Sequence, residues 1–180
     1  MKRLIFVTGQ PGVGKTSVLL RVADALKTGG YNVRGMISRE VREQGTRVGF
    51  EIRDFHTGQK GWLAHIRQTS GPQVGKYRVN LDDLKNIGVN SILNAIKNTD
   101  IIIVDEIGPM ELFSQAFRDA IFQAAESTKP LLGTIHFRAQ HPLIDAIKTR
   151  NDIELFTVTV ENRQNIHNLI ITKILKILQK

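Results

Sequence analysis

The residues best suited to chemistry lie close together near the start of the sequence. Residues 9–16 read GQPGVGKT, which fits the pattern G-x-x-x-x-G-K-[ST] at each fixed position. Glycines allow the backbone to wrap so tightly that its N–H groups point inward, where they bind phosphate groups. The residues expected to contact phosphate are Gly9, Gln10, Pro11, Gly12, Val13, Gly14, Lys15 and Thr16.

The last two residues of this phosphate loop, Lys15 and Thr16, carry functional side chains. A Lys at this position reaches the β- and γ-phosphates of a nucleotide, and a Thr hydroxyl ligates Mg²⁺. The residues that follow are apolar at helical spacing, and the positive end of such a helix attracts anions. The loop therefore predicts a site for a nucleoside triphosphate, with Mg²⁺ as cofactor.

Two carboxylates follow the most hydrophobic stretch of the chain, the segment DIIIV at residues 100–104. At the end of a buried strand, Asp105 is placed to complete the metal site begun by Thr16. Glu106 is then free to polarise a water molecule for in-line attack on the γ-phosphate. The structural alternative is that Glu106 caps the next segment or pairs with a basic neighbour.

Arginines follow two later predicted strands. Arg138 is a candidate to stabilise charge on the departing phosphate, although a solvated loop charge is the simpler explanation. Asn162 and Arg163, in the segment TVENRQN, are candidates to contact the nucleoside base. Thr134 and His136 are further candidates to sense the γ-phosphate.

The elements that must position these residues alternate along most of the chain. Strands are expected at residues 3–8, 31–37, 100–104, 131–135 and 153–160, and helices at 15–28, 81–97, 111–127, 142–149 and 164–178. This alternation predicts one α/β domain over residues 1–180, with a parallel sheet covered by helices on both faces. Residues 35–66 interrupt it with an antiparallel hairpin or three-stranded meander that carries arginines.

Composition narrows the class of protein. The chain has no cysteine, no apolar run of the 18 or so residues that cross a membrane, and a start unlike a signal peptide. We therefore expect a cytoplasmic protein without a membrane partner.

Residues 1–99 carry 16 Lys and Arg against seven Asp and Glu, so the net charge of +8 lies in the first half. Such a field attracts nucleotides, nucleic acid or an acidic partner.

The motifs together resemble a family of small nucleoside-triphosphatases first described from thermophiles, with a human cancer-related member. The resemblance covers essentially the whole chain. It rests on TGQPGVGKT at residues 8–16, GMISREVREQGTRVGFEI at 35–52, VGKYRVNL at 74–81, VDEIGPMELFS at 104–114 and VTVENR at 158–163. A phosphate loop alone is shared by a vast superfamily, whereas this combination is much more specific.

The resemblance implies a three-layer P-loop NTPase fold with a RecA-like sheet. It also implies slow, Mg²⁺-dependent hydrolysis of ATP, GTP and other nucleoside triphosphates, with Glu106 activating water. Within the fourth motif it adds Gly108 and Glu111 to the nucleotide-binding residues. Pro109 departs from the family pattern, in which Lys often takes this place, so any contribution of that charge is missing here.

Two other functions share the phosphate loop. A small nucleoside or nucleotide kinase needs an acceptor pocket and usually an Arg-rich lid late in the chain, whereas the arginines here come early. A nucleotide-gated switch would use the basic hairpin to bind nucleic acid. The pair Asp105 and Glu106 favours hydrolysis over the kinase, whereas a switch can coexist with hydrolysis. The sequence leaves the oligomeric state open.

Overall fold

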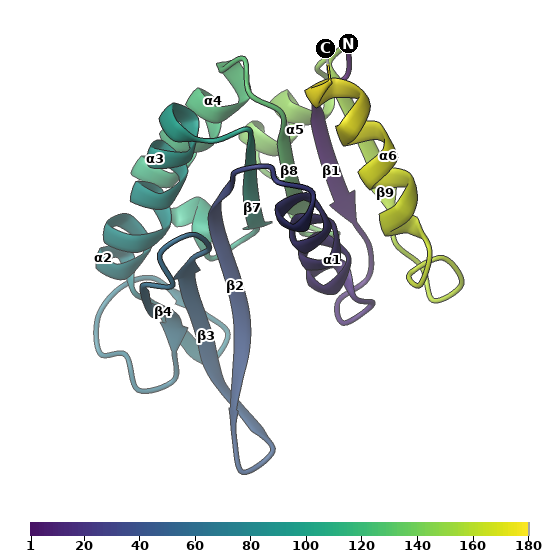
Figure 1. Cartoon of the computed structure of the whole chain (residues 1–180). Helices are drawn as coiled ribbons and strands as arrows, with labels where there is room; N and C mark the ends of the chain where they lie inside the picture. The colour runs from purple at the N-terminus through teal and green to yellow at the C-terminus, as the bar shows by residue number, and fades with distance from the viewer. Residues whose placement is uncertain (180) are drawn as a thin grey trace.

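The computed structural model describes residues 1–179. It shows one sheet that combines parallel and antiparallel strands (Figure 1). The strands are β1 (Leu4–Thr8), β2 (Val33–Glu43), β3 (Thr46–Asp54), β4 (Lys60–His65), β5 (Gln73–Val74), β6 (Tyr77–Val79), β7 (Ile101–Ile107), β8 (Leu131–Ile135) and β9 (Ile153–Thr157). Over the described residues their order is β5-β6-β4-β3-β2-β7-β8-β1-β9. The part from β2 to β9 is parallel, and β3 to β6 extend it in antiparallel fashion.

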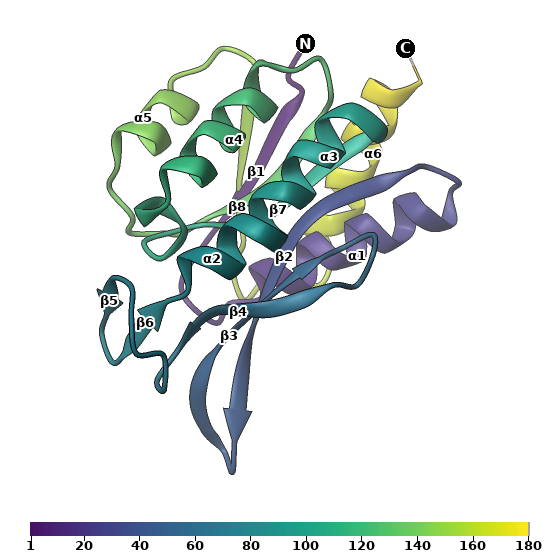
Figure 2. The same cartoon turned by 90° about the vertical axis from the view of Figure 1, so that its left-hand side faces the viewer.

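Helices cover both faces of this sheet (Figure 2). They are α1 (Lys15–Thr28), α2 (Leu81–Asp83), the π-helical η1 (Leu84–Val89), α3 (Asn90–Asn98), the 3-10 helix η2 (Glu111–Phe113), α4 (Gln115–Glu126), α5 (Pro142–Lys148) and α6 (Ile166–Leu178). Buried side chains of α1 and α6 form one core with the sheet, and those of α3, α4 and α5 form another. The predicted three-layer α/β fold is thus confirmed.

The buried strands supply both cores because alternate side chains point to opposite faces. In β1, Ile5 and Val7 belong to the core beneath α1, whereas Leu4 and Phe6 belong to the core beneath α4. A strand buried on both sides therefore needs a continuous apolar run, which is the pattern seen in the sequence. In β7, the residues Ile101 to Val104 are all fully buried.

β8 lies between β1 and β7, so the phosphate loop and the paired acids come from strands that do not touch directly. All three strands are parallel, and their carboxyl ends therefore meet at one edge of the sheet. The β2–β3 hairpin projects beyond this same edge, past the start of α1 (Figure 1). The antiparallel insertion is confirmed, but its first strand is a continuation of β2 and not a separate element.

Several boundaries differ from those predicted. β7 continues through Asp105 and Glu106 to Ile107, so the two acids lie within the strand and not after it. The helix predicted from Glu111 begins only after Ser114, whose Oγ accepts a hydrogen bond from the Phe117 N–H at 3.1 Å. The helix over 81–97 begins at the predicted cap, Asn80, but its middle is π-helical.

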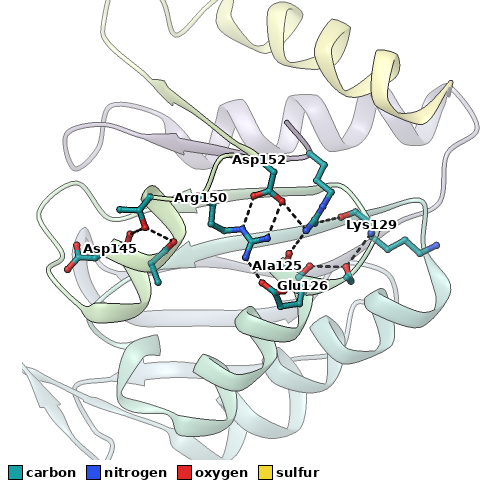
Figure 3. A network of polar contacts seen from close by, with 11 residues as sticks. Ala125, Glu126, Lys129, Asp145, Arg150 and Asp152 are labelled. Carbon is teal, nitrogen blue, oxygen red and sulfur yellow. Dashed lines mark hydrogen bonds and ion pairs between the residues drawn. The ribbon is translucent and has the colours of Figure 1, made fainter. Parts of the chain in front are cut away.

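The opposite edge of the sheet is held by charged side chains (Figure 3). Arg150 Nε donates a hydrogen bond to Asp152 Oδ1 at 2.8 Å, and Arg3 Nη2 pairs with Asp152 Oδ2 at 3.1 Å. Arg150 also pairs with Glu126, and Arg3 donates to the Lys129 carbonyl at 3.3 Å. These contacts tie the starts of β1 and β9 to the end of α4. Within residues 1–179, the helices are all too short or too polar to cross a membrane.

Candidate active site

The phosphate loop joins β1 to α1, and its shape depends on glycine at two positions. Gly9 has a φ of 155°, and a Cβ there would lie 2.6 Å from the Val158 carbonyl oxygen. Gly14 caps α1 in a left-handed conformation, with a φ of 112°. A glycine cap leaves the first N–H groups of α1 facing outward from the helix, where they can bind an anion.

Lys15 and Thr16 lie on the first turn of α1 and point in different directions. Lys15 Nζ donates to the carbonyls of Gly9 at 2.9 Å and Gln10 at 3.3 Å, so its ammonium group lies across the loop. Thr16 Oγ1 donates a hydrogen bond of 2.9 Å to Asp105 Oδ2. The loop and the end of β7, 89 residues apart in the chain, are thus in direct contact.

Asp105 is buried and has a threonine on each of its oxygens. Thr134 Oγ1, from β8, donates to Asp105 Oδ1 at 2.6 Å. Burial raises the pKa of Asp105, while the hydrogen bonds from Thr134 and Thr16 and the charge of Lys15 act in the opposite direction. The sequence predicted a phosphate-sensing role for Thr134; the structure places its hydroxyl on the carboxylate instead.

The oxygens of Thr16 and Asp105 suit Mg²⁺, which prefers hard oxygen ligands and keeps several waters or phosphate oxygens. Since their side-chain oxygens lie 2.9 Å apart, one ion can contact both. Among the described residues, no cluster of three or more His, Asp and Glu side chains forms a metal cage. A Mg²⁺ ion here would take its remaining ligands from the nucleotide and from water.

Glu106 and Glu111 form a second acidic pair. A Cβ placed on Gly108 would lie 3.0 Å from Glu106 Oε1 and 3.1 Å from Glu111 Oε2, so the two carboxyl groups flank this glycine. Burial, reinforced by the charge of Asp105, raises the pKa of Glu106 to about 7, against the opposing effect of Lys15. Burial and the nearby Glu106 raise the pKa of Glu111 well above its ordinary value.

A cavity of about 490 Å³, here called the hairpin cavity, opens between the phosphate loop and the antiparallel strands. One end is lined by Lys15, Thr16, Asp105 and Glu106. The other end is lined by Arg47, Phe50, Leu63, Val74 and Met110. Sequence reasoning missed this second group, because its members come from β3, β4, β5 and the turn after β7.

A second cavity of about 470 Å³, the β9 cavity, lies along the other side of the phosphate loop. It is lined by loop residues, by the segment after β9 and by Arg163. Asn162 shapes this segment: its side-chain amide donates to the Thr157 carbonyl at 2.9 Å and its Oδ1 accepts from the Thr159 N–H at 2.8 Å. Of the two residues predicted to contact the base, Arg163 therefore lines the cavity and Asn162 holds its wall.

Arg138 lies on the loop after β8, where it is exposed and lines neither cavity. Its backbone N–H donates to His136 Nδ1 at 3.2 Å. His136 lines the hairpin cavity, and burial together with the charges of Lys15 and Arg138 lowers its pKa. Pro109 lines the same cavity.

A family model described as "NTPase" matches residues 4–171, and this range contains every site residue named above. The chain belongs to this NTPase family. Curated proteins named nucleoside-triphosphatase THEP1 match it closely. The protein from Thermofilum pendens is 45% identical, with 87% of each chain covered. The protein from Methanopyrus kandleri is 42% identical, with 100% of this chain and 99% of its own covered.

Solved structures agree with the NTPase family assignment. The crystal structure of THEP1 from Aquifex aeolicus matches with a TM-score of 0.85 and 32% identity, over 95% of this chain and 98% of its own. The solution structure of a human cancer-related nucleoside triphosphatase matches with a TM-score of 0.83 and 34% identity, over 97% of this chain and 98% of its own. Both family members named in the resemblance, thermophilic and human, are thus recovered.

Proposed function

We propose that this chain hydrolyses nucleoside triphosphates to diphosphates and phosphate, with Mg²⁺ as cofactor. The observation that best supports this proposal is the hydrogen bond between Thr16 and Asp105, which joins the phosphate loop to the acidic end of β7. The relatives named nucleoside-triphosphatase support the same reaction class. The fold places these groups at the sheet edge where α/β proteins bind ligands.

Binding begins with the loop. The N–H groups at the start of α1 and the Lys15 ammonium are the groups that hold the β- and γ-phosphates. Thr16 and Asp105 hold Mg²⁺, which when bound polarises the terminal phosphoryl group as a Lewis acid. Thr134 fixes the second oxygen of Asp105, which orients the first oxygen toward Thr16.

Glu106 is the proposed general base. Its carboxylate takes a proton from a water molecule while the water oxygen bonds to the γ-phosphorus and the bond to the β-phosphate oxygen breaks. A base is most effective when its pKa lies near the working pH, and burial raises the pKa of Glu106 to about 7. Glu106 lines the hairpin cavity at the end next to Lys15 and Thr16, where the γ-phosphate is expected.

The β9 cavity is the proposed site of the nucleoside. Its lining comprises phosphate-loop residues and the segment after β9, including the polar side chains of Gln10, Glu161 and Arg163. Because the relatives are named nucleoside-triphosphatases without reference to one base, we infer that ATP, GTP and other triphosphates are all substrates. A catalytic contact from Arg138 would require this exposed side chain to swing toward the terminal phosphate.

The nucleic-acid switch has less support, because the hairpin arginines are largely paired. Glu51 accepts hydrogen bonds from Arg39 at 3.1 Å and Arg53 at 2.9 Å, and Glu40 pairs with Arg42 at 2.8 Å and Arg47 at 3.4 Å. The basic excess is thus partly neutralised where it was expected to bind nucleic acid. The cysteine-free composition fits a reducing compartment, so we infer a cytoplasmic location.

The test is phosphate release from ATP, GTP, CTP and UTP by wild type and Glu106→Gln, with and without Mg²⁺. We expect all four nucleotides to be hydrolysed only with Mg²⁺, and Glu106→Gln to bind but not hydrolyse them. Release at the wild-type rate by Glu106→Gln would remove the general-base assignment. The absence of phosphate release from every nucleotide would overturn the proposed function.

A further inference from the structure

The hairpin cavity is larger than hydrolysis requires. A water molecule takes up roughly 30 Å³ in the liquid, whereas small-molecule sites commonly measure about 300–1,000 Å³. At about 490 Å³, the hairpin cavity falls in the second range. A terminal phosphate with its metal ion fills only the end beside Lys15 and Thr16, so the end beside Phe50, Leu63 and Val74 is left for another molecule.

The nucleoside does not account for this space. The linings of the two cavities have only Pro11 and Gly12 in common. In the sheet, β1, which leads into the phosphate loop, lies between β9 and the strands beside the hairpin cavity, so the two cavities flank the loop. A triphosphate lying along the loop, with its base in the β9 cavity beside Arg163, points its terminal phosphate into the hairpin cavity. The far end of the hairpin cavity is then in front of the γ-phosphorus, on the side from which a nucleophile attacks in line.

The wall at that far end is built to contact an organic ring. Its apolar residues are Phe50, Leu63, Val74 and Met110. Such a surface offers water no hydrogen bonds, so replacing the water with an apolar ring is favourable. Arg47 lies over the Phe50 ring at 5.2 Å and its Nε donates to the Tyr77 hydroxyl at 2.9 Å, so its guanidinium plane is held in place. A fixed guanidinium plane and an aromatic ring are surfaces on which flat rings stack.

We propose that the hairpin cavity binds a small ring-containing primary alcohol, of at most nucleoside size, as a phosphoryl acceptor. This inference rests on the proposed function for the position of the γ-phosphate. The hydroxyl oxygen of the alcohol bonds to the γ-phosphorus, the bond from this phosphorus to the β-phosphate oxygen breaks, and the hydroxyl proton passes to Glu106. The products are a phosphate monoester and a nucleoside diphosphate, and hydrolysis is the same reaction with water in the cavity.

A kinase needs an acceptor pocket, which the sequence alone could not reveal, and the hairpin cavity offers one, although the arginines lie early in the chain and not in a late lid. The residues of its far wall span positions 47–110, from β3 to the turn after β7. They meet because β3, β4 and β6 pair in sequence beside β2, which places the antiparallel strands next to the acidic end of β7.

The test is transfer of labelled γ-phosphate from Mg-ATP to the four ribonucleosides and to benzyl alcohol, with free phosphate measured in the same tubes. Wild type is expected to label at least one of these alcohols. Val74→Trp, which places a large side chain at the far end of the cavity, is expected to lower the ratio of transfer to hydrolysis at least tenfold. Val41→Trp, on the β2–β3 hairpin and outside the cavity lining, is the control for a large side chain placed elsewhere on the antiparallel strands and should leave the ratio unchanged.

The outcomes separate the two proposals. If wild type releases free phosphate but labels no alcohol, the acceptor site is overturned and the hydrolysis proposal is kept. If it labels an alcohol but releases no free phosphate, the hydrolysis proposal is overturned and the acceptor site is kept. An unchanged ratio in a folded Val74→Trp variant also overturns the acceptor site. Ligand-observed NMR of adenosine and benzyl alcohol with ADP-bound wild type gives a readout independent of folding in the variant: no binding of either counts against the proposal.

Discussion

Asp105 and Glu106 are neighbours in one strand, yet their surroundings suit them to different tasks. Asp105 accepts a hydrogen bond from a threonine on each oxygen, so its orientation is fixed. Glu106 instead lies beside Glu111 and lines the hairpin cavity, where a nucleophile can reach it. Two adjacent carboxylates held in different environments are a common basis for dividing metal binding from proton transfer.

The first prediction concerns Glu106. Glu106→Gln keeps the size of the side chain but removes the base, so nucleotide affinity should be preserved while turnover falls. Loss of a general base commonly costs about 10²–10⁴ in rate, and we expect a fall within that range. Phosphate release and titration with a fluorescent nucleotide measure the two effects separately. The exposed hairpin-tip variant Glu43→Gln is the control and should retain wild-type turnover.

The second prediction concerns Lys15, whose ammonium lies across the phosphate loop. Lys15→Ala removes a charged hydrogen-bond donor to the phosphates, a loss worth roughly 1.5–3 kcal/mol, or about 10- to 150-fold in affinity. Equilibrium binding of ATP should show this weakening. Lys85→Ala, on the exposed side of η1, removes the same charge away from the site and should bind ATP normally. Equal affinity in wild type and Lys15→Ala would exclude the predicted contact.

At the scale of elements, close packing of strands places the site. β2 pairs with β7 from Val33 to Met36, and this pairing brings the hairpin to the acidic end of β7. Gly35 is the point of closest approach: a Cβ there would lie 1.9 Å from the Ile103 carbonyl oxygen, and its φ is 144°. Since the obstacle is backbone, neither strand can yield without breaking their pairing.

The third prediction follows for Gly35→Ala, which should destabilise the fold by more than about 4 kcal/mol or prevent soluble expression. Gly45→Ala at the hairpin tip is the matched control. Its φ of 79° strains alanine, but no atom lies within 4 Å of the added Cβ, so a cost of only about 1–2 kcal/mol is expected. Urea unfolding of both variants measures the difference. Comparable losses would show that the approach of β2 to β7 does not limit stability.

The parallel strands could be predicted from the sequence because burial on both faces demands an unbroken apolar run, as in Ile101 to Val104. The residues at which these strands end could not be predicted. Asp105 and Glu106 interrupt the apolar run although the backbone continues as a strand to Ile107. The short β5–β6 hairpin was also missed, since Gln73–Val74 and Tyr77–Val79 are too short to show an alternating pattern.

At the scale of the whole molecule, the phosphate loop was predictable because its function depends on consecutive residues. The hairpin cavity was not predictable in this way. Arg47, Phe50 and Leu63 line it together with Glu106, and no local spacing connects these positions. Only the pairing order of the strands brings them together. The arginines of the hairpin were noticed in the sequence, but their ion pairs with Glu40 and Glu51 depend on strand register.

The two ends of the parallel strands have different roles, one in binding and catalysis and the other in stability. The carboxyl ends of the strands carry the site, and the opposite edge carries the ion pairs among Arg3, Glu126, Arg150 and Asp152 (Figure 3). The hydrogen bond from Arg150, together with the charges of Arg150 and Arg3, lowers the pKa of Asp152 despite partial burial. Because the site lies far from this network along the strands, stability can be tested there without touching nucleotide binding.

The last prediction uses this lowered pKa. An aspartate whose pKa is lower in the folded than in the unfolded state stabilises the fold above the ordinary value of about 3.9 and loses this effect as the pH falls below it. Asp152→Asn should therefore cost roughly 1.5–3 kcal/mol near neutral pH, the usual worth of hydrogen bonds to charged groups. The difference from wild type should be smaller at about pH 3 than near neutral pH, and it should vanish only below the lowered folded-state pKa, where the carboxyl group is protonated in both states.

Urea unfolding of wild type and Asp152→Asn at the two pH values measures this double difference. Asp24→Asn, on the exposed face of α1, is the matched control and should change stability by less than about 0.5 kcal/mol at both. A difference for Asp152→Asn that persists undiminished at low pH would mean that the carboxylate charge is not what holds β9 to β1 and α4. Unchanged ATP binding by Asp152→Asn would show that the ion pairs of Asp152 contribute to stability without affecting the nucleotide site.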